Sequence, residues 1–209
     1  MKILETVSLP LAGTHLIRFA RFCDQRGYFT ETFRRSDFDG LDFLEGIQFV
    51  QSNESFSKRG VIRGLHFQWN PYMGKLVRTI QGRAIDLILD IRSGSPTFGK
   101  AIAVDLPATP DADANEWVWI PPGFAHGNLF TEPTTIEYFC SGQYSHGCEA
   151  GISPLAADID WSLCDPKLKA TFDEFSSTTA ILTDKDRIGF TLGSWSQEEA
   201  AKNFVYGQC

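Results

Sequence analysis

Two histidines and a lysine occupy settings that suit proton transfer. His66 lies in the segment 63–68, which reads Arg-Gly-Leu-His-Phe-Gln, and Lys75 follows it closely. His126 comes much later and ends the turn pattern Pro-x-Gly-x-x-His. A neutral imidazole can remove a proton next to a carbonyl, and a nearby cation stabilises the resulting enolate. These residue types therefore indicate acid–base chemistry at a carbon beside a carbonyl group.

Strand periodicity predicts how these side chains are held. Gln68 lies two residues after His66, so both side chains share one face of a strand. If Lys75 returns on an adjacent strand, a β-barrel holds all three at one mouth. Asp86 and Asp90 also share a face and are candidates to orient these groups. A lone histidine is typically a hydrogen-bonded structural residue, but two histidines with a lysine and inward acids favour a functional site.

The middle of the chain has the pattern of short β-strands. Most segments between residues 45 and 150 alternate apolar and polar residues, with turn residues between them. The clearest is 84–92, which follows the breaker Gln81-Gly82 and places Ile85, Leu87 and Leu89 on one face. The other predicted strands are 75–80, 100–106, 116–120 and 135–140. This spacing predicts an all-β, closed or sandwiched antiparallel fold.

The two ends of the chain have different patterns. Residues 35–38 predict a short capped helix, and the capping-box pattern at 196–199 predicts a helix that continues through Phe204. Residues 107–115 predict a surface loop. The length favours one domain over 1–209, with an N-terminal strand arm and a C-terminal helical tail.

The composition limits the kind of partner. The chain of 209 residues is 43% hydrophobic and contains 17 Phe and 5 Trp, enough for a full aromatic core. A formal net charge of −7 argues against nucleic acid or an anionic membrane as the main partner. The same charge opposes a phosphorylated substrate, so a phosphate site needs locally clustered Arg and Lys. No stretch approaches about 18 consecutive apolar residues, which excludes a membrane-spanning helix.

The cysteines indicate the compartment. There are five, an odd number, and none forms a CxxC pair. The N-terminus lacks the pattern of a secretory signal because charge and proline interrupt its apolar run. We therefore expect reduced thiols in a soluble cytoplasmic protein.

A metal site is the main alternative use of the two histidines. The segment that ends at His126 resembles the second motif of metal-binding cupins, and His66 occupies the corresponding part of their first motif. Where those proteins place a second His and a Glu, this chain has Gln68 and Lys75. A lysine beside a cation site is unfavourable, and two histidines fall short of the three protein ligands usual in catalytic sites. We therefore expect no metal.

Six segments, in order, resemble the dTDP-4-dehydrorhamnose 3,5-epimerase family. They lie between about Asp24 and Asp186, and the most specific is the central signature that contains His66 and Lys75. The six segments are 24–31, 49–53, 63–78, 90–99, 120–127 and 182–186. The resemblance implies a cupin-type jelly-roll β-barrel or sandwich with short flanking helices. It also implies a homodimer whose N-terminal strands cross to the partner, and a reaction without cofactor or metal.

The resemblance also implies roles for single residues. The family removes protons adjacent to the C4 ketone of a dTDP-4-keto-6-deoxy sugar. By this resemblance His66 is the base, Asp186 its partner, and Lys75 the group that stabilises the enolate oxygen. The residues implied to bind the nucleotide sugar are Arg26, Glu31, Gln51, Asn53, Arg63, His126, Glu149 and Lys185.

The resemblance breaks in the last predicted strand. The family pattern there is Glu-Phe-Leu-Tyr, whose Tyr protonates carbon from the opposite face, whereas residues 137–140 read Glu-Tyr-Phe-Cys. A thiol at Cys140 reaches less far than a phenol and donates weakly. Tyr138 shares a strand face with Cys140, roughly 6.5 Å away. We therefore include Tyr138 among the catalytic residues, with Tyr144 as another candidate donor.

Two further departures surround the sugar end of the expected pocket, at 128–134 and 153–156. We expect an epimerase of deoxysugar biosynthesis, with 3,5-epimerisation as the family default. One alternative is epimerisation at a single centre, C3 or C5, of a different nucleotide sugar. Another is a sugar-nucleotide-binding protein without turnover, although retention of His66, Lys75 and Asp186 argues against it.

Overall fold

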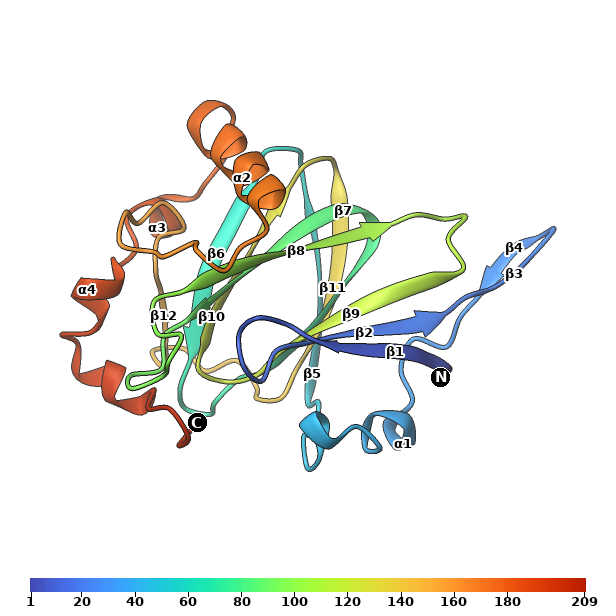
Figure 1. Ribbon diagram of the computed structural model, residues 1–209, viewed down its shortest axis with the longest axis horizontal. Helices are drawn as coiled ribbons and strands as arrows, with labels where there is room; N and C mark the ends of the chain where they lie inside the picture. The colour runs from blue at the N-terminus through green and yellow to red at the C-terminus, as the bar shows by residue number, and fades with distance from the viewer.

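The computed structural model describes residues 1–209 and is built from antiparallel strands (Figure 1). The strands are β1 Ile3–Ser8, β2 His15–Ala20, β3 Phe22–Asp24, β4 Gly27–Phe29, β5 Gln51–Ser57, β6 Ile62–Gln68, β7 Lys75–Asp90, β8 Ala101–Ala108, β9 Ala114–Ile120, β10 Phe124–Phe130, β11 Thr134–Cys140 and β12 Glu149–Gly151. The helices are α1 Arg35–Phe38, α2 Pro166–Thr178, α3 Asp184–Arg187 and α4 Leu192–Trp195, with 3₁₀ turns at Asp42–Leu44 and Glu199–Asn203. The predicted all-β fold with short flanking helices is confirmed.

The strands form two layers that share β7. Sheet I has the order β1-β2-β9-β7-β11-β5, and sheet II has the order β8-β7-β10-β6-β12. Strands β3 and β4 form a separate hairpin that projects from the body of the molecule (Figure 1). Because alternate side chains of each strand point to opposite sides, both sheets bury apolar residues between them and on their outer faces.

Strand β7 changes sheets at a glycine. Its first half pairs with β9 and β11, and its second half, from Gly82 onward, pairs with β8 and β10. Gly82 has φ +84°, and a Cβ there would lie 2.4 Å from the carbonyl oxygen of Pro133. The prediction of two strands, 75–80 and 84–92, separated by a break is therefore wrong. The ladder exchanges its partners at Gly82 and the strand continues.

Three apolar clusters hold the layers together. Between the sheets lie fully buried residues such as Val77, Ile88 and Val118. Outside sheet I, Trp117 packs with Phe38 of α1 in a second cluster. Outside sheet II, a third cluster joins the strands to α2 and the C-terminal segment; among its members are Ile85, Leu87, Leu89, Phe172, Trp195 and Phe204. The predicted alternation of Ile85, Leu87 and Leu89 against Asp86 and Ile88 is confirmed.

The chain ends differ from the prediction. The helix at 35–38 is confirmed, although Arg34 caps it without a side-chain hydrogen bond. The α-helix expected from 196 to 204 is replaced by the 3₁₀ turn Glu199–Asn203. The capping box is formed by Thr191 and Ser194, and Ser196 already ends α4. The expected loop at 107–115 is shorter, because β8 continues to Ala108 and β9 begins at Ala114.

The longest helix, α2, was not predicted. Asp165 accepts hydrogen bonds from the backbone N–H groups of Lys167 and Leu168, and Pro166 occupies the first turn. These are ordinary signals of a helix start, so the sequence contained them. With 13 residues α2 is too short to span a bilayer, and no other helix is long and apolar enough to do so.

The change of sheets at Gly82 leads to a stability prediction. Gly94 has a similar φ of +80° but no atom near its missing Cβ, so Gly94→Ala adds backbone strain alone, about 1–2 kcal/mol. Gly82→Ala adds the same strain and an overlap with the backbone at Pro133, so we expect a clearly larger loss of unfolding free energy. Urea unfolding of both variants measures this. Equal losses would show that β7 changes sheets without needing glycine.

Candidate active site

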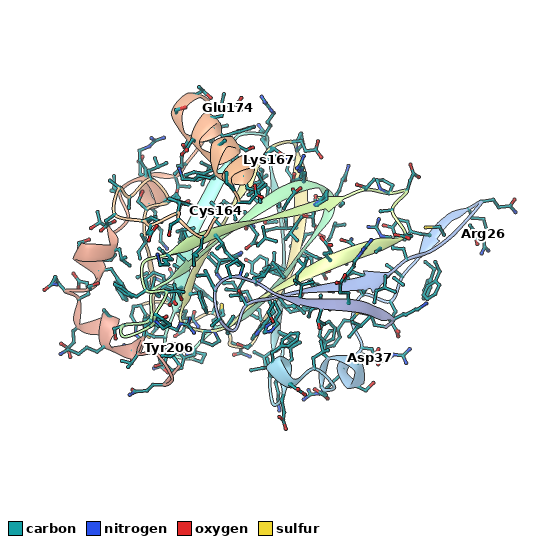
Figure 2. All side chains as sticks on the ribbon, viewed as in Figure 1. Arg26, Asp37, Cys164, Lys167, Glu174 and Tyr206 are labelled. Atoms are coloured by element: carbon teal, nitrogen blue, oxygen red, sulfur yellow. The ribbon has the colours of Figure 1, made fainter.

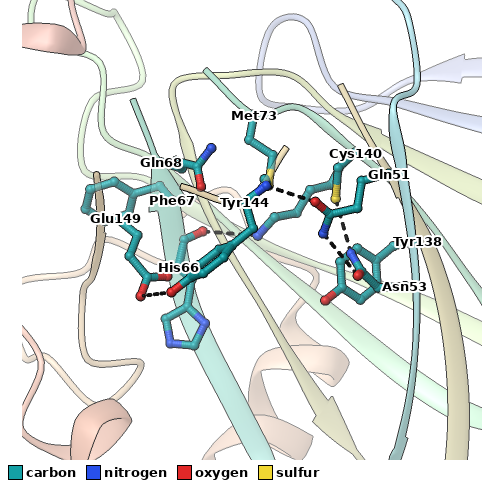
Figure 3. A pocket seen from close by; sticks show the side chains of 11 residues that line it. Gln51, Asn53, His66, Phe67, Gln68, Met73, Tyr138, Cys140, Tyr144 and Glu149 are labelled. Carbon is teal, nitrogen blue, oxygen red and sulfur yellow. Dashed lines mark hydrogen bonds between the residues drawn. The ribbon is translucent and has the colours of Figure 1, made fainter. Parts of the chain in front are cut away.

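A polar cavity lies between the sheets where β5, β6, β7 and β11 come together (Figure 3). It has two adjoining parts of about 400 and 330 Å³, and His66, Lys75 and Tyr138 line both. The first part is also lined by Gln51, Asn53, Phe67, Gln68, Met73, Cys140, Tyr144 and Glu149. The second is also lined by Ser55, Arg63, Gly64, His126, Gly127, Asn128, Ile136, Thr183, Lys185 and Asp186. The shared residues make the two parts one site.

His66 and Asp186 form a hydrogen-bonded pair at the centre. His66 comes from β6, Asp186 comes from α3, and 2.7 Å separates Nε2 from Oδ1. The side chain of Asp186 is 4% exposed and that of His66 is 36% exposed. Burial pushes the pKa of Asp186 upward, but hydrogen bonds from His66, Thr183 and the Gly64 backbone hold it below its ordinary value. The ionised carboxylate thus orients the imidazole, whose Nδ1 has no hydrogen-bond partner in the protein.

A second histidine–carboxylate pair lies deeper. His126 on β10 is opposite His66 on β6, and its Nε2 lies 2.8 Å from Oδ2 of Asp86. Asn128 donates to the same oxygen at 2.9 Å. Burial lowers the pKa of His126, although Asp86 acts in the opposite direction. His126 is therefore a neutral imidazole near pH 7, held in one orientation by Asp86.

Two glycines allow the strands that carry the histidines to approach closely. A Cβ on Gly64 would lie 2.6 Å from Cα of Gly127, and a Cβ on Gly127 would lie 2.2 Å from the carbonyl oxygen of Arg63. Gly64 also has φ +106°, a conformation that side chains rarely adopt. The glycines of the Arg-Gly-Leu-His and His-Gly sequences therefore let β6 and β10 pack closely, and this close packing places the two imidazoles on one wall of the cavity.

Asp90 does not take part in the site. It pairs with Arg92 and accepts hydrogen bonds from the hydroxyl groups of Ser95 and Thr97. Of the two acids expected to orient the site, only Asp86 does so. The expectation for Asp90 is wrong because residues of the loop after β7 form hydrogen bonds with its carboxylate.

Lys75 enters the cavity from the opposite sheet. It lies in the half of β7 that belongs to sheet I, next to β9 and β11, and its Nζ donates to the backbone oxygen of His66 at 3.4 Å. The condition stated for Lys75, a strand adjacent to β6, is not met because β10 lies between β6 and β7, but Lys75 still lines one cavity with His66 and Gln68. Burial lowers the pKa of Lys75, although Cys140, Asp86 and Glu149 oppose this. The amino group of Lys75, whose one hydrogen bond goes to the His66 backbone, lines the same cavity as the pair of His66 and Asp186.

Amide and thiol groups line the wall beside Lys75. Gln51 donates to Asn53 at 3.1 Å, and Asn53 donates to Sγ of Cys140 at 3.5 Å (Figure 3). Cys140 is fully buried and pairs across the ladder with Lys75. Burial raises the pKa of the Cys140 thiol, against the effect of Lys75 and Asn53, so the thiol stays protonated. Tyr138 lines the same wall, as its strand periodicity predicted.

The rim carries a charged cluster. Lys185 and the Tyr144 hydroxyl both donate to Oε1 of Glu149, each at 3.0 Å. Burial alone would raise the pKa of Glu149, but hydrogen bonds from Lys185 and Tyr144 outweigh this effect, so the pKa lies below its ordinary value.

Gln68 shares the face of His66 as predicted, but hydrogen bonds to the backbone of Pro71, Gln143 and Ser145 occupy its amide. Gln68 therefore stabilises the loops at the rim of the cavity by hydrogen bonds.

Ten of the twelve predicted site residues line the cavity, and two do not. Arg26 lies at the tip of the β3–β4 hairpin, where it pairs with Asp24 and is 84% exposed (Figure 2). Glu31 pairs with the N-terminal amine and with Arg34. The structure thus places both residues away from the cavity of their own chain.

Some lining residues were missed by the sequence analysis. Asn128 donates a second hydrogen bond to Oδ2 of Asp86, and its position two residues after His126 on one strand was a usable signal. Ser55 carried the same signal, since it lies two residues after Asn53 on β5, whereas Met73 carried none. No three His, Cys, Asp or Glu side chains are grouped as metal ligands, because Asp186 and Asp86 engage separate imidazoles.

Comparison with known proteins gives a consistent answer. A family model described as dTDP-4-dehydrorhamnose 3,5-epimerase matches residues 8–194. Over 189 residues the chain is 43% identical to the dTDP-4-dehydrorhamnose 3,5-epimerase of Pseudomonas aeruginosa, covering 89% of this chain and 94% of that protein. The epimerase of Legionella pneumophila in complex with dTDP-4-keto-L-rhamnose has a TM-score of 0.81 and 29% identity, covering 98% of this chain and 99% of that one.

A structure with a different outcome is also similar. A 3′-monoepimerase from Streptomyces bikiniensis, in complex with dTDP-quinovose, has a TM-score of 0.74 and 28% identity, covering 90% of this chain and 89% of that one. The fold and the histidine–carboxylate site therefore define a carbohydrate epimerase with a cupin-type jelly roll, an enzyme of the isomerase class. The chain belongs to the dTDP-4-dehydrorhamnose 3,5-epimerase family.

The buried state of His126 leads to a prediction of pH dependence. Its pKa is lower in the folded protein than the ordinary 6.5. Below about pH 6.5 the unfolded chain therefore protonates this histidine, whereas the folded protein keeps it neutral. The free energy of unfolding thus decreases as the pH drops, by at most about 1.4 kcal/mol per pH unit. We expect His126→Gln to lose this part of the slope. Urea unfolding from about pH 7.5 to about 5.5 tests this, and identical slopes in both proteins would contradict it.

Proposed function

We propose that this epimerase acts on a nucleotide-linked 4-keto-6-deoxy sugar, of the dTDP-4-keto-6-deoxyglucose type. The observation that carries the proposal is the pair of His66 and Asp186 at 2.7 Å, facing the ammonium of Lys75 across one cavity. A base, a carboxylate that orients it and a cation are the groups needed to form an enolate and stabilise it. The ligands bound in the similar structures, dTDP-4-keto-L-rhamnose and dTDP-quinovose, are dTDP-linked sugars and support a substrate of this class.

His66 takes the proton from the carbon next to the C4 ketone. Asp186 stabilises the imidazolium that forms, so the base becomes stronger than a free imidazole. The C–H electron pair moves into the enolate, and negative charge develops on the ketone oxygen. Lys75 meets this charge, and its partial burial strengthens the interaction.

The nucleotide part is held by local positive charge against the overall charge of −7. Arg63 and Lys185 line the second part of the cavity and are the cations placed to meet a diphosphate. The amides of Gln51 and Asn53 can bind the nucleoside or the sugar hydroxyls. Glu149 and His126 complete the polar lining that we assign to substrate binding.

Two stereochemical outcomes compete. Inversion at both C3 and C5 is the outcome in the family name, and a relative of 43% identity carries that name. Inversion at one centre is favoured by Cys140, which the resemblance aligns with the family's acid, and by the similar 3′-monoepimerase structure. With Cys in place of Tyr at this position, the sugar would also bind in a different orientation.

We also propose a homodimer in the cytoplasm. Arg26 and Glu31 match the family motif for nucleotide binding, yet both lie away from their own cavity. The β3–β4 hairpin projects from the body and exposes Tyr28 and Phe29, which suits insertion into a second copy of the chain. The five free thiols suit a reducing compartment.

Solvent deuterium incorporation tests the function. In deuterated water we expect proton NMR to show loss of the signal next to the ketone of dTDP-4-keto-6-deoxyglucose. His66→Asn should slow this exchange by about 10²–10⁴-fold, because the base is lost. His146→Asn is the matched control, since His146 is exposed and outside the cavity. Absence of exchange with every 4-keto sugar nucleotide tried would overturn the proposal and favour a binding protein.

Mixing of inactive variants tests the dimer. Arg26→Ala should weaken nucleotide binding and His66→Asn should remove the base, so each homodimer loses activity. If the hairpin serves the partner's cavity, a mixed dimer contains one intact site. Random mixing after refolding should then restore about a quarter of the wild-type activity. No recovery, with mixed dimers demonstrated by mass spectrometry, would show that Arg26 acts within its own chain or not at all.

A further inference from the structure

The last residues of the chain, 199–209, form a tail that is fixed to the end of β7. The tail lies beyond residues 8–194, which the family model matches. Phe204 is fully buried, and its backbone oxygen accepts hydrogen bonds from the N–H and the hydroxyl of Ser93 at 2.8 and 3.2 Å. The N–H of Tyr206 donates back to the oxygen of Ser93 at 3.0 Å. The tail is therefore an ordered part of the fold.

The tail contacts the loop of residues 69–74, which joins β6 to β7 and which we call the rim loop. The Tyr72 hydroxyl donates a hydrogen bond to the backbone oxygen of Asn203 at 2.6 Å. The ring of Phe204 meets the rings of Trp69 and Tyr72 edge to face, with centroids 6.4 and 6.0 Å apart. One hydrogen bond and an aromatic cluster thus join the tail to the rim loop.

The rim loop also contacts the loop of residues 141–148, which follows β11. The N–H of Gly74 donates to the Ser141 hydroxyl at 2.7 Å, and the N–H of Ser141 donates to the Gly74 oxygen at 2.9 Å. The two loops meet most closely at Gly142, where a Cβ would lie 2.5 Å from the backbone oxygen of Tyr72. A displacement of Tyr72 would therefore move both loops.

Both loops carry residues that line the cavity, whereas the groups that move the proton lie elsewhere. Met73 of the rim loop and Tyr144 of the second loop line the first part of the cavity (Figure 3). His66 and Asp186 lie on β6 and α3, and Lys75 is held in its ladder by β9 and β11. The tail is thus placed to affect substrate binding without contacting the base or its partner.

We propose that Tyr72 is a positioning residue for substrate binding. Its hydrogen bond to the tail holds the rim loop, and through that loop Met73 and Tyr144, in the arrangement that the substrate requires. The inference rests on the proposed function of the site. Ordering of a loop on binding reduces affinity, so a loop that is already held in place binds its ligand more tightly. The proton transfer itself does not depend on Tyr72.

The variant Tyr72→Phe tests this because it removes the hydroxyl and keeps the ring in the aromatic cluster. Loss of one hydrogen bond should raise KM for dTDP-4-keto-6-deoxyglucose about 3- to 10-fold. We expect kcat to stay within about twofold of the wild-type value, because the lost contribution acts on binding alone. Initial rates of epimerisation, followed by proton NMR over a range of substrate concentrations, separate the two constants.

Hydrogen exchange shows whether the effect passes through the loops. In Tyr72→Phe without substrate, mass spectrometry should show faster amide exchange in peptides covering 69–74 and 141–148. Exchange in β6, which carries His66, should stay as in wild type. Tyr206→Phe is the matched control, because Tyr206 lies in the same tail and its ring packs on Arg92. This control should leave KM, kcat and the exchange of both loops unchanged.

Each other outcome contradicts the proposal. An unchanged KM with lower stability to urea would give the Tyr72 hydroxyl a purely structural role. A fall in kcat alone would place its effect on the chemical step, and a higher KM without faster exchange of the loops would exclude action through them. Absence of turnover in the wild-type protein is a different result, because it overturns the proposed function itself and with it a role of Tyr72 in binding this substrate.

Discussion

The site depends on one constraint, which is that a single strand of 16 residues belongs to both sheets. Its first half places Lys75 in sheet I, and its second half places Asp86 in sheet II, behind His126. The exchange of partners occurs at Gly82, where the conformation and the nearby backbone exclude a side chain. Because the strand is continuous, the cation and the second histidine pair have a fixed separation across the cavity.

The charges of the site follow from burial. Carboxylates at Asp186 and Asp86 orient two imidazoles that differ in access, since one is 36% exposed and the other is buried. The accessible imidazole can exchange protons with solvent, whereas the deeper one stays neutral and shapes the wall. Lys75 stands opposite with its pKa lowered by burial. In the proposed function Lys75 is the local cation that meets the developing oxyanion, in a chain whose net charge is −7.

Much of this arrangement could be predicted from single residues. The alternation of Leu87 and Leu89 against Asp86 identified a strand with one inward acid, and the spacing of His66 and Gln68 placed both on one face. The shared face of Tyr138 and Cys140 also followed from the period of two. By contrast, the helix after Asp165 was missed although its cap was visible, because a local start signal competes with many similar ones. The capping box was assigned to Ser196 when Thr191 forms it.

By itself, the sequence determined the class of fold, the faces of the strands and the identity of the groups that can move protons. The tertiary structure decided which of those groups meet. Lys75 lies on the sheet that faces His66, Asp90 pairs with Arg92, and Arg26 lies away from the cavity on a projecting hairpin. The physical reason is that side-chain alternation is a local property of a strand, whereas the pairing of strands depends on contacts between residues far apart in the chain.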